Sequence, residues 1–464
     1  MSQPISVQDT ISPQSGKKYS LYSLPSFDNN QTREELDGSE IQSNKYTVPD
    51  KCILFNKLNV RFKRVWRIDN IDDNKICSTE FLPLVVDENK VDYQYCYYLL
   101  ISDQITNYLC GQNANTSGSH KRIDPTDFLN IELPTLPAME EQKRIGQLLC
   151  SLDQKIALNR AINDNLEAMA KQLYDHWFVQ FDFPNEEGKP YKSCGGKMVW
   201  NEKLKREIPE GWNVVTLIDF AEIKNGATPS TANPLNYGGN IIWITPKDLS
   251  DQQSKFVYQG ERNISQLGYD SCSTNLLSAN SVLLSSRAPI GLVSIAMTEL
   301  CTNQGFKSLV PHDTNNSLYL YYYIKHHIKQ IEQLGTGTTF KEVSREDLCK
   351  FPILMPCNAL GYLQWVERMT QIADEQFILT KEIANLNKQR DELLPLLMNG
   401  QVSVNYHLLV LEVAVNIGKN LHFFSQFSPS ACRFEVDSPS HIFNGRGIRL
   451  PHFVFSGHLA SQAV

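Results

Sequence analysis

An internal repeat constrains the fold of this chain more than any other feature of its sequence, because each copy must form the same supersecondary unit. Residues 53–57 (ILFNK) correspond to residues 282–286 (VLLSS), and residues 77–81 (CSTEF) correspond to residues 301–306 (CTNQGF). Three further pairs follow in the same order: small-residue loops 116–119 and 335–339, segments 123–128 and 343–348, and proline-bounded segments 134–137 and 352–356. The sequence therefore predicts two copies of one mixed α/β globule, each followed by a long helical pattern.

The two long helices are predicted from apolar residues at alternating steps of three and four, the spacing of helices that pair with each other. We expect them at about residues 140–178 and 361–398. The apolar seams are Ile145, Leu149, Leu152, Ile156, Leu166, Met169, Leu173 and Trp177 in the first, and Leu379, Ile383, Leu386, Leu393 and Leu397 in the second. Isolated helices about 60 Å long are marginal in water, so each needs the other. An antiparallel pair places the two globules at opposite ends.

Polar residues interrupt both seams. Asn159 and Asn163 lie in the middle of the first, and Arg390 falls in the second. A buried seam asparagine costs stability but fixes the register of the pair. The alternative is that the helices flare apart at this point, and the sequence leaves both open.

Composition excludes several classes of protein. Hydrophobic residues make up 41% of the chain and charged residues 20%, which are ordinary values for globular domains. The eleven cysteines form no Cys-x-x-Cys and lie beside no zinc-spaced histidine pair, which favours reduced thiols in a cytoplasmic protein. We recognise no signal peptide or membrane-length apolar segment. The net charge of −7 means that any nucleic-acid contact must rest on local patches or on partners.

Catalytic motifs are not found in the sequence. Residues 195–197 (GGK) lack the first glycine and the hydroxyl residue of a phosphate-binding loop. Residues 233–237 (NPLNY) lack the second proline of the adenine methyltransferase motif, and no glycine-rich cofactor loop accompanies them. The acidic pattern of residues 49–50 and 88–90 is too degenerate to indicate a nuclease. We therefore predict no active site and no bound metal or cofactor.

A basic segment stands out at residues 51–67, which hold six Lys or Arg residues and no acidic residue. Alternation predicts one strand whose outward face carries Lys57, Asn59, Arg61, Lys63 and Arg67, and whose buried face carries Leu58, Val60, Phe62 and Trp66. Such a row of cations and amides suits contacts with phosphates and base edges. The alternative is a solvated basic face that binds no ligand.

Further candidate DNA-contacting residues occupy matched positions of the two copies. Ser285, Ser286 and Arg287 stand where the second copy matches the basic segment, with far less charge. The loops and the cations that follow them contribute Ser119, His120, Lys121 and Arg122 in the first copy, and Thr338, Thr339 and Lys341 in the second. Small hydroxyl residues let a loop approach a groove closely, although the same composition also forms ordinary turns.

Several motifs together resemble those of the specificity subunit of Type I restriction–modification systems, over about residues 10–405. The motifs are residues 136–145 (LPAMEEQKRI), 177–178 (WF), 195–200 (GGKMVW), 208–212 (IPEGW), 242–249 (IWITPKDL) and 390–401 (RDELLPLLMNGQ). The resemblance implies an α/β (α+β) fold with two similar target recognition domains, separated by an antiparallel coiled-coil spacer in a pseudo-two-fold arrangement. Each domain of that family reads one half of a split, asymmetric sequence in double-stranded DNA.

The resemblance also implies domain boundaries and partners. We expect target recognition domains at 1–137 and 208–356, long helices at 138–181 and 357–400, a connector at 182–207 and a tail at 401–464. Two methyltransferase subunits dock on the helices in this family, and restriction subunits join through the complex. The specificity subunit has no catalytic residues. S-adenosylmethionine is expected on the methyltransferase partners, and ATP and Mg²⁺ on the restriction partners.

Two departures from the family pattern leave alternatives open. The first globule begins early and lacks a counterpart of residues 208–212, so it could belong to a shorter subtype. The tail resembles nothing in the family and could be an added strand segment or the product of an altered reading frame. Two other functions also stay open at this point: a two-headed adaptor that binds protein, and a nuclease or methyltransferase in its own right.

Overall fold

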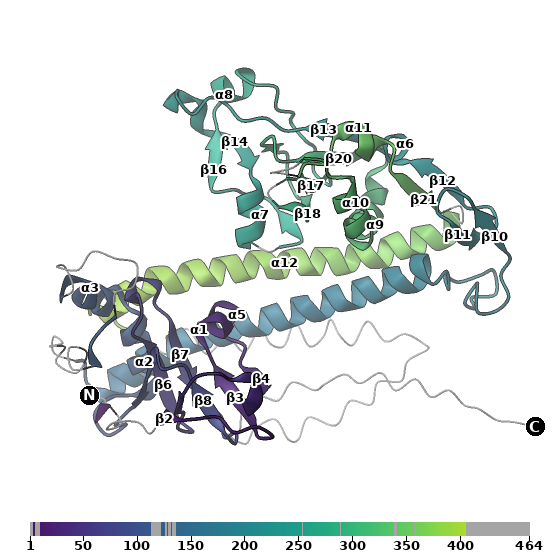
Figure 1. Ribbon diagram of the computed structural model, residues 1–464. Helices are drawn as coiled ribbons and strands as arrows, with labels where there is room; N and C mark the ends of the chain where they lie inside the picture. The colour runs from purple at the N-terminus through teal and green to yellow at the C-terminus, as the bar shows by residue number, and fades with distance from the viewer. Residues whose placement is uncertain are drawn as a thin grey trace, which may run out of the picture. The chain divides into compact units, whose positions relative to one another are not determined.

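The computed structural model describes residues 3–4, 10–112, 122–125, 128, 131, 136–252, 254–287, 289–337, 341–356 and 359–404 (Figure 1). Contacts between residues gather Met1–Ser403 into one compact unit. This grouping does not test the expected domain boundaries, which stay predictions. Most of the tail at 401–464 lies outside the described residues.

The N-terminal α/β region is built on two sheets with the strand orders β1-β9-β6-β7 and β2-β5-β8-β3-β4. Its strands are β1 (Gln3–Pro4), β2 (Thr10–Ile11), β3 (Lys18–Tyr22), β4 (Glu34–Asp37), β5 (Lys45–Thr47), β6 (Cys52–Asn56), β7 (Val65–Ile68), β8 (Lys75–Cys77) and β9 (Phe81–Val85). Its helices are α1 (Leu24–Asp28), α2 (Tyr93–Ile101) and α3 (Asp103–Gln112). All five residues of β6 are buried, so this inner strand forms the centre of the first core.

The second α/β region repeats this plan with sheets β13-β20-β17-β18-β15 and β16-β14-β19 and a pair β12-β21. Its strands are β12 (Asn213–Thr216), β13 (Ala221–Asn225), β14 (Tyr237–Ile244), β15 (Phe256–Val257), β16 (Arg262–Ile264), β17 (Val282–Ser286), β18 (Ile290–Ala296), β19 (Cys301–Thr302), β20 (Lys307–Pro311) and β21 (Pro352–Met355). Its helices are α6 (Leu217–Phe220), α7 (Pro246–Gln252), α8 (Gln266–Asp270), α9 (Ser317–His326), α10 (Ile328–Leu334) and α11 (Arg345–Cys349). Every residue of β17 is buried, as in β6.

Equivalent backbone hydrogen bonds confirm the predicted repeat. The amide of Ile123 donates to the carbonyl of Lys57 at 3.0 Å, and the amide of Val343 donates to the carbonyl of Ser286 at 3.0 Å. The amides of Lys57 and Ser286 in turn donate to carbonyl groups, each of the residue that precedes a matched phenylalanine, Phe81 or Phe306. These second bonds are Lys57 to Glu80 at 2.8 Å and Ser286 to Gly305 at 2.7 Å. Residues that match in sequence thus hold the same place in the two scaffolds.

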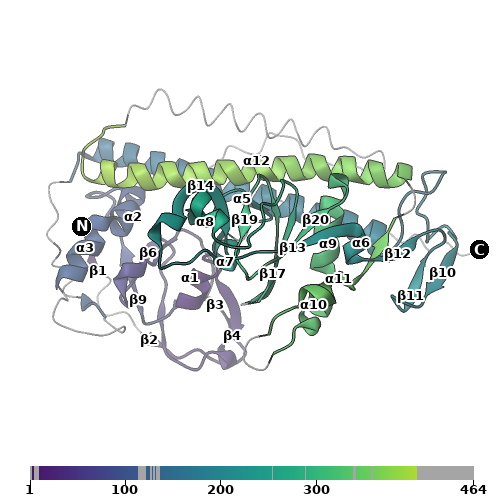
Figure 2. The same ribbon diagram turned by 90° about the horizontal axis from the view of Figure 1, so that it is seen from above.

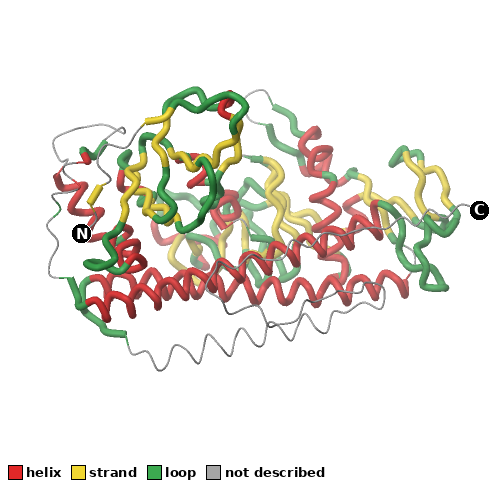
Figure 3. The backbone as a smooth tube through the Cα atoms, turned by 90° about the horizontal axis from the view of Figure 1, so that it is seen from below, coloured by secondary structure: helices red, strands yellow, loops and turns green. Residues whose placement is uncertain are grey.

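Two long helices pair with each other, as the sequence predicts: α5 (Met139–Tyr174) and α12 (Ala359–Met398). A π-helical turn, η3 (Asp175–Val179), extends α5. The pair is antiparallel, because Asp153 near the start of α5 contacts Arg390 near the end of α12 at 3.0 Å. The helices lie side by side in both views (Figures 1 and 3).

Polar contacts hold the middle of the helix pair together. Asn159 is fully buried, and its Nδ2 donates to Oε2 of Glu382 on α12 at 2.9 Å. Lys155 forms an ion pair with the same glutamate. The helices therefore do not flare apart at Asn159, and the register-fixing interpretation is the one that the structure supports.

The two α/β regions contact different stretches of α5. In the N-terminal region, the Tyr98 hydroxyl donates to Asp153 at 2.5 Å. In the second region, Lys255 forms an ion pair with Glu167 at 3.3 Å. The second region also buries Trp365 of α12 completely in an aromatic cluster. Each region is therefore attached to its own part of the helix pair.

The predicted connector forms a hairpin of β10 (Met198–Asn201) and β11 (Arg206–Pro209), which stands beside β12 (Figure 2). The aromatic residues that flank this hairpin, Phe181, Phe183 and Trp212, are buried in the same cluster as Trp365. The connector is thus anchored at both of its ends.

Candidate nucleic-acid interface

The basic segment at 51–67 folds as a hairpin and not as the single strand that alternation predicts. Strand β6 ends at Asn56, a short helix η2 (Val60–Phe62) follows, and β7 begins at Val65. The predicted division into an outward and a buried face is therefore wrong. The clearest case is Phe62, which was expected to be buried and has 63% of its surface exposed.

Asparagine side chains explain why the chain turns here. The Asn56 side chain donates to the Leu58 carbonyl at 2.5 Å and accepts from the Leu58 amide at 2.9 Å, which ends the ladder of β6. Asn59 then adopts the left-handed conformation with φ of 52°, and Lys63 does so with φ of 43°. Asparagine tolerates this conformation better than most residues, so Asn56 and Asn59 together were the sequence signal of the turn.

Ion pairs with distant residues neutralise half of the cations in this segment. The pairs are Lys51 with Glu88, Lys63 with Asp103 at 2.6 Å, and Arg64 with both carboxylate oxygens of Asp28 at 2.7 and 2.8 Å. Paired cations attract phosphates less strongly, because the acidic partner cancels most of the field. Of the predicted row, Lys63 therefore has an acidic partner, and the contact of the row with phosphates stays a prediction.

Two more cations of the segment face the protein interior. Lys57 is half-buried, lies 5.6 Å from the centre of the Tyr46 ring, and has a pKa lowered by burial. Arg67 points to α5, where its Nη1 lies 3.6 Å from Sγ of Cys150 and its guanidinium lies 5.1 Å from the Tyr97 ring. Neither side chain is fully exposed, as a place on the predicted outward face would require.

Arg61 is the exception within the segment. Its side chain is exposed and makes no ion pair or hydrogen bond with any residue that the structure describes. It stands beside the exposed Phe62, over whose ring the Arg64 guanidinium lies at 5.0 Å. The hairpin tip thus presents one exposed aromatic ring and one cation that is unpaired within the described residues.

The matched serines of the second copy are buried. Ser285 is 0% exposed, and its hydroxyl donates to the Pro289 carbonyl at 2.7 Å and accepts from the Leu292 amide at 2.8 Å. Ser286 is 1% exposed, and its hydroxyl donates to the Gly305 carbonyl at 3.2 Å. Both hydroxyls stabilise the turn after β17, which corrects their nomination as DNA contacts.

Cations near that turn are partly paired. Arg287 lies 3.5 Å from Glu342, which also binds Lys307 at 3.1 Å. Lys341 is exposed and has no ion-pair or hydrogen-bond partner within the described part of the chain. Of the second-copy candidates, Thr338 and Thr339 lie outside the described residues.

The corresponding position of the first copy carries Arg122, which is exposed and forms a bidentate ion pair with Glu80. An isolated bridge pairs this arginine with Leu58, just after the end of β6. Ser119, His120 and Lys121 lie outside the described residues. The first copy therefore places Arg122 beside Leu58, in the hairpin that also carries Arg61.

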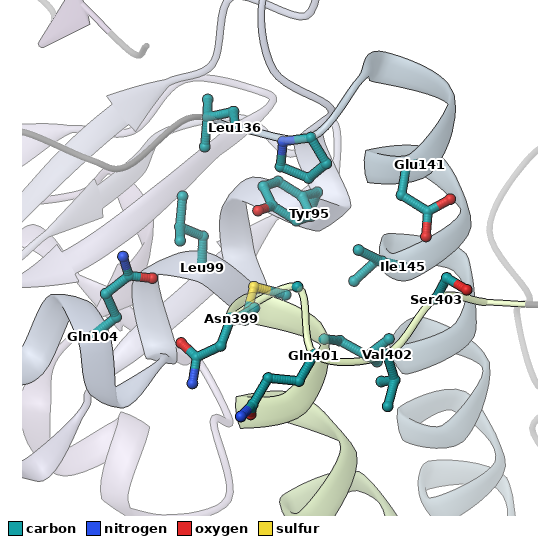
Figure 4. A pocket seen from close by; sticks show the side chains of 14 residues that line it. Tyr95, Leu99, Gln104, Leu136, Glu141, Ile145, Asn399, Gln401, Val402 and Ser403 are labelled. Carbon is teal, nitrogen blue, oxygen red and sulfur yellow. The ribbon is translucent and has the colours of Figure 1, made fainter.

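A cavity of about 600 Å³ lies where the chain leaves α12 and passes the start of α5 (Figure 4). Its lining mixes apolar and amide side chains, among them Leu99, Ile145, Asn399 and Gln401. Glu141 is the single charged residue of that lining. The cavity therefore does not suit an anionic ligand such as a nucleotide.

Within the part of the chain that the structure describes, no group of three or more His, Cys, Asp and Glu side chains lies close enough to hold a metal ion. No helix of the described residues is long and apolar enough to cross a membrane.

Known proteins resemble this chain in sequence and fold. A family model described as the Type I restriction modification DNA specificity domain matches residues 10–168 and 209–393. The HindI specificity subunit of Haemophilus influenzae is 27% identical over 401 residues, covering 75% of this chain and 86% of that protein. The MjaIX specificity subunit of Methanocaldococcus jannaschii is 38% identical over 166 residues, which is 34% of this chain and 38% of that protein. The crystal structure of the S subunit from M. genitalium shares the fold, with a TM-score of 0.52, 14% identity and coverage of 83% of this chain and 90% of that one.

Proposed function

Because the chain belongs to the family of Type I restriction–modification specificity subunits, whose members are not catalytic, we propose that it reads a double-stranded DNA target in two halves. Each α/β region reads one half. The observation that carries this proposal is the repeat: Lys57 and Ser286 hold equivalent backbone positions, yet the surfaces around them differ in charge and shape. Two copies of one scaffold with different exposed side chains suit an asymmetric target.

The helix pair supplies the second part of the proposal. Two methyltransferase subunits dock on α5 and α12, and restriction subunits join through the complex. Residues such as Asn159 and Arg390 fix the register of the pair, so they also fix the number of base pairs between the two half-sequences. S-adenosylmethionine is bound by the methyltransferase partners, and ATP and Mg²⁺ by the restriction partners, in the cytoplasm.

DNA retention and methyl transfer test the proposal together. The purified chain is assayed with and without the methyltransferase of its own system, on genomic fragments. We expect no methylation or cleavage by the chain alone, and sequence-specific binding and adenine methylation by the assembled complex. Methyl transfer by the pure chain would show that it is an enzyme. A complex that assembles but retains no DNA would favour the protein-binding adaptor.

An exchange of domains tests the division of labour. Replacing residues 1–137 by the matching part of a relative should change one half of the methylated sequence and leave the other half unchanged. The matched control replaces residues 208–356 and should change the opposite half. If both halves changed in either chimera, the two regions would not read independently.

A further inference from the structure

We infer that the tip of the β6–β7 hairpin, formed by Arg61 and Phe62, is a DNA-contacting element that belongs to the first half of the target alone. This inference rests on the proposed function and deepens it. The ring of Phe62 packs against base edges or a base step in a groove, and Arg61 binds a neighbouring phosphate. Proteins that deform DNA insert apolar side chains between base steps in this way.

The backbone holds the tip in one conformation. The Phe62 amide donates to the Asn59 carbonyl at 3.2 Å, and the Lys63 amide donates to the Val60 carbonyl at 3.0 Å. Val60 itself is buried, so the turn is rooted in the core. A rigid tip loses little conformational freedom on binding, which favours affinity and discrimination.

Two ion pairs fix the tip to neighbouring helices. Lys63 binds Asp103 of α3 at 2.6 Å, and Arg64 binds Asp28 of α1 through two hydrogen bonds. Because Arg64 also lies 5.0 Å from the ring centre of Phe62, it supports the ring from one side. These cations are thus used to hold the aromatic ring, while Arg61 has no partner among the described residues.

An exposed aromatic ring beside unpaired charge needs a partner that is both anionic and able to stack. Phe62 exposes 63% of its surface, next to the exposed Arg61, and Arg122 bridges Leu58 in the same hairpin. Duplex DNA offers phosphates and aromatic base edges at this spacing, whereas an apolar protein surface would leave Arg61 desolvated and unpaired.

The matched connection in the second copy is shorter. There Ser286 pairs directly with Ile290 across the hairpin. In the first copy, Phe55 pairs with Val65 and the intervening residues form the tip. The effect of the tip must therefore be confined to the half-sequence read by the N-terminal region.

The test uses the full chain assembled with its methyltransferase subunits and duplexes bearing the methylated sequence found by mapping. The variants are Phe62→Ala, Phe62→Leu and Arg61→Gln. Ile71→Ala is the matched control, because Ile71 is 89% exposed in the loop at the other end of β7. Affinity is measured for every single base-pair change in both halves, and at several salt concentrations.

Phe62→Ala should lower affinity about 10-fold and weaken discrimination in the first half only, with Phe62→Leu in between. Arg61→Gln should reduce the slope of log K against log salt by about one unit, and Ile71→Ala should change nothing. If the wild-type complex binds its sequence and Phe62→Ala binds with unchanged discrimination, the inference is overturned while the proposed function stands. Loss of methyltransferase assembly by Phe62→Ala would also overturn it, since the tip would then be a protein contact. A wild-type complex that binds no DNA would overturn both.

Discussion

Lys255 attaches the second α/β region to both long helices, and its replacement by methionine should alter how stability depends on pH. Its Nζ lies 2.7 Å from the Tyr322 hydroxyl, 2.9 Å from Oε1 of Gln376 on α12 and 3.3 Å from Oε2 of Glu167 on α5. Its side chain is 8% exposed. One ammonium group thus joins three separate elements.

Burial lowers the pKa of Lys255 from 10.5 to about 8, although Glu167 opposes the shift. Between these values the unfolded chain binds the proton more tightly than the folded chain does, so the free energy of unfolding rises with pH. The contribution of Lys255 to stability is complete above its pKa in the unfolded chain, and it is lost as pH falls through its lower pKa in the folded chain. For a shift of this size, the gain from pH 7 to pH 9.5 is about 2 kcal/mol.

Urea denaturation at pH 7 and 9.5 measures this gain as a difference between the wild-type chain and Lys255→Met. The difference removes the opposing effect of buried tyrosines, whose pKa values are raised and whose ionisation in the unfolded chain lowers stability at high pH. Tryptophan fluorescence reports the right region, because Trp177, Trp212 and Trp365 lie in one cluster there. A difference that is flat with pH, or that falls as pH rises, would refute the reasoning.

Three further perturbations test the acid sensitivity, the helix contact and the spacing. Burial lowers the pKa of His327 to about 4, so the free energy of unfolding of the wild type should fall by about 2 kcal/mol between pH 7 and pH 4.5. The fall is measured relative to His327→Phe, which keeps a ring stacked on Tyr323. Equal acid unfolding profiles of the two chains would contradict this. Arg390→Met should cost about 1–3 kcal/mol by leaving the Asp153 carboxylate without its cation, and adding Asp153→Asn should restore part of the loss in a double-mutant cycle; additive losses would mean no coupling. Inserting four residues after Asn163 adds about 6 Å to α5, and methylation mapping should show a gap longer by about one base pair between unchanged half-sequences; an unchanged gap in an active complex would mean that the helices do not set it.

The helices were predictable because a seam of this length has few alternative explanations. The first helix was expected at about 140–178 and is formed by Met139–Tyr174 with the π-helical turn Asp175–Val179. The second was expected at about 361–398 and is formed by Ala359–Met398. The seam itself was less accurate, since Met169 is 44% exposed and Ala170 is fully buried in its place. A straight helix drifts relative to a strict seven-residue repeat, so the buried face moves on by one residue after a few turns.

The candidate site was harder to predict, because the number of charges along a segment does not show which of them pair with distant residues. The acidic partners of Lys63 and Arg64 are Asp103 and Asp28, which no pattern within the segment can reveal. Alternation also failed at Phe62, because a strand and a hairpin that turns at an asparagine give similar patterns over a few residues. Pairing of distant segments therefore decided which cations remain available.

The repeat explains how two surfaces on one scaffold can differ so much. Arg122 precedes Ile123 in the first copy, and Glu342 precedes Val343 in the second, so matched positions carry opposite charges. Each has a partner of the opposite sign, Glu80 just before β9 for the arginine and Lys307 at the start of β20 for the glutamate. The ion pair is thus kept while its direction is reversed, and the backbone bonds of Ile123 and Val343 are equal in length. Because buried strands and backbone bonds hold the scaffold, the charges at its edge are free to differ between the two copies.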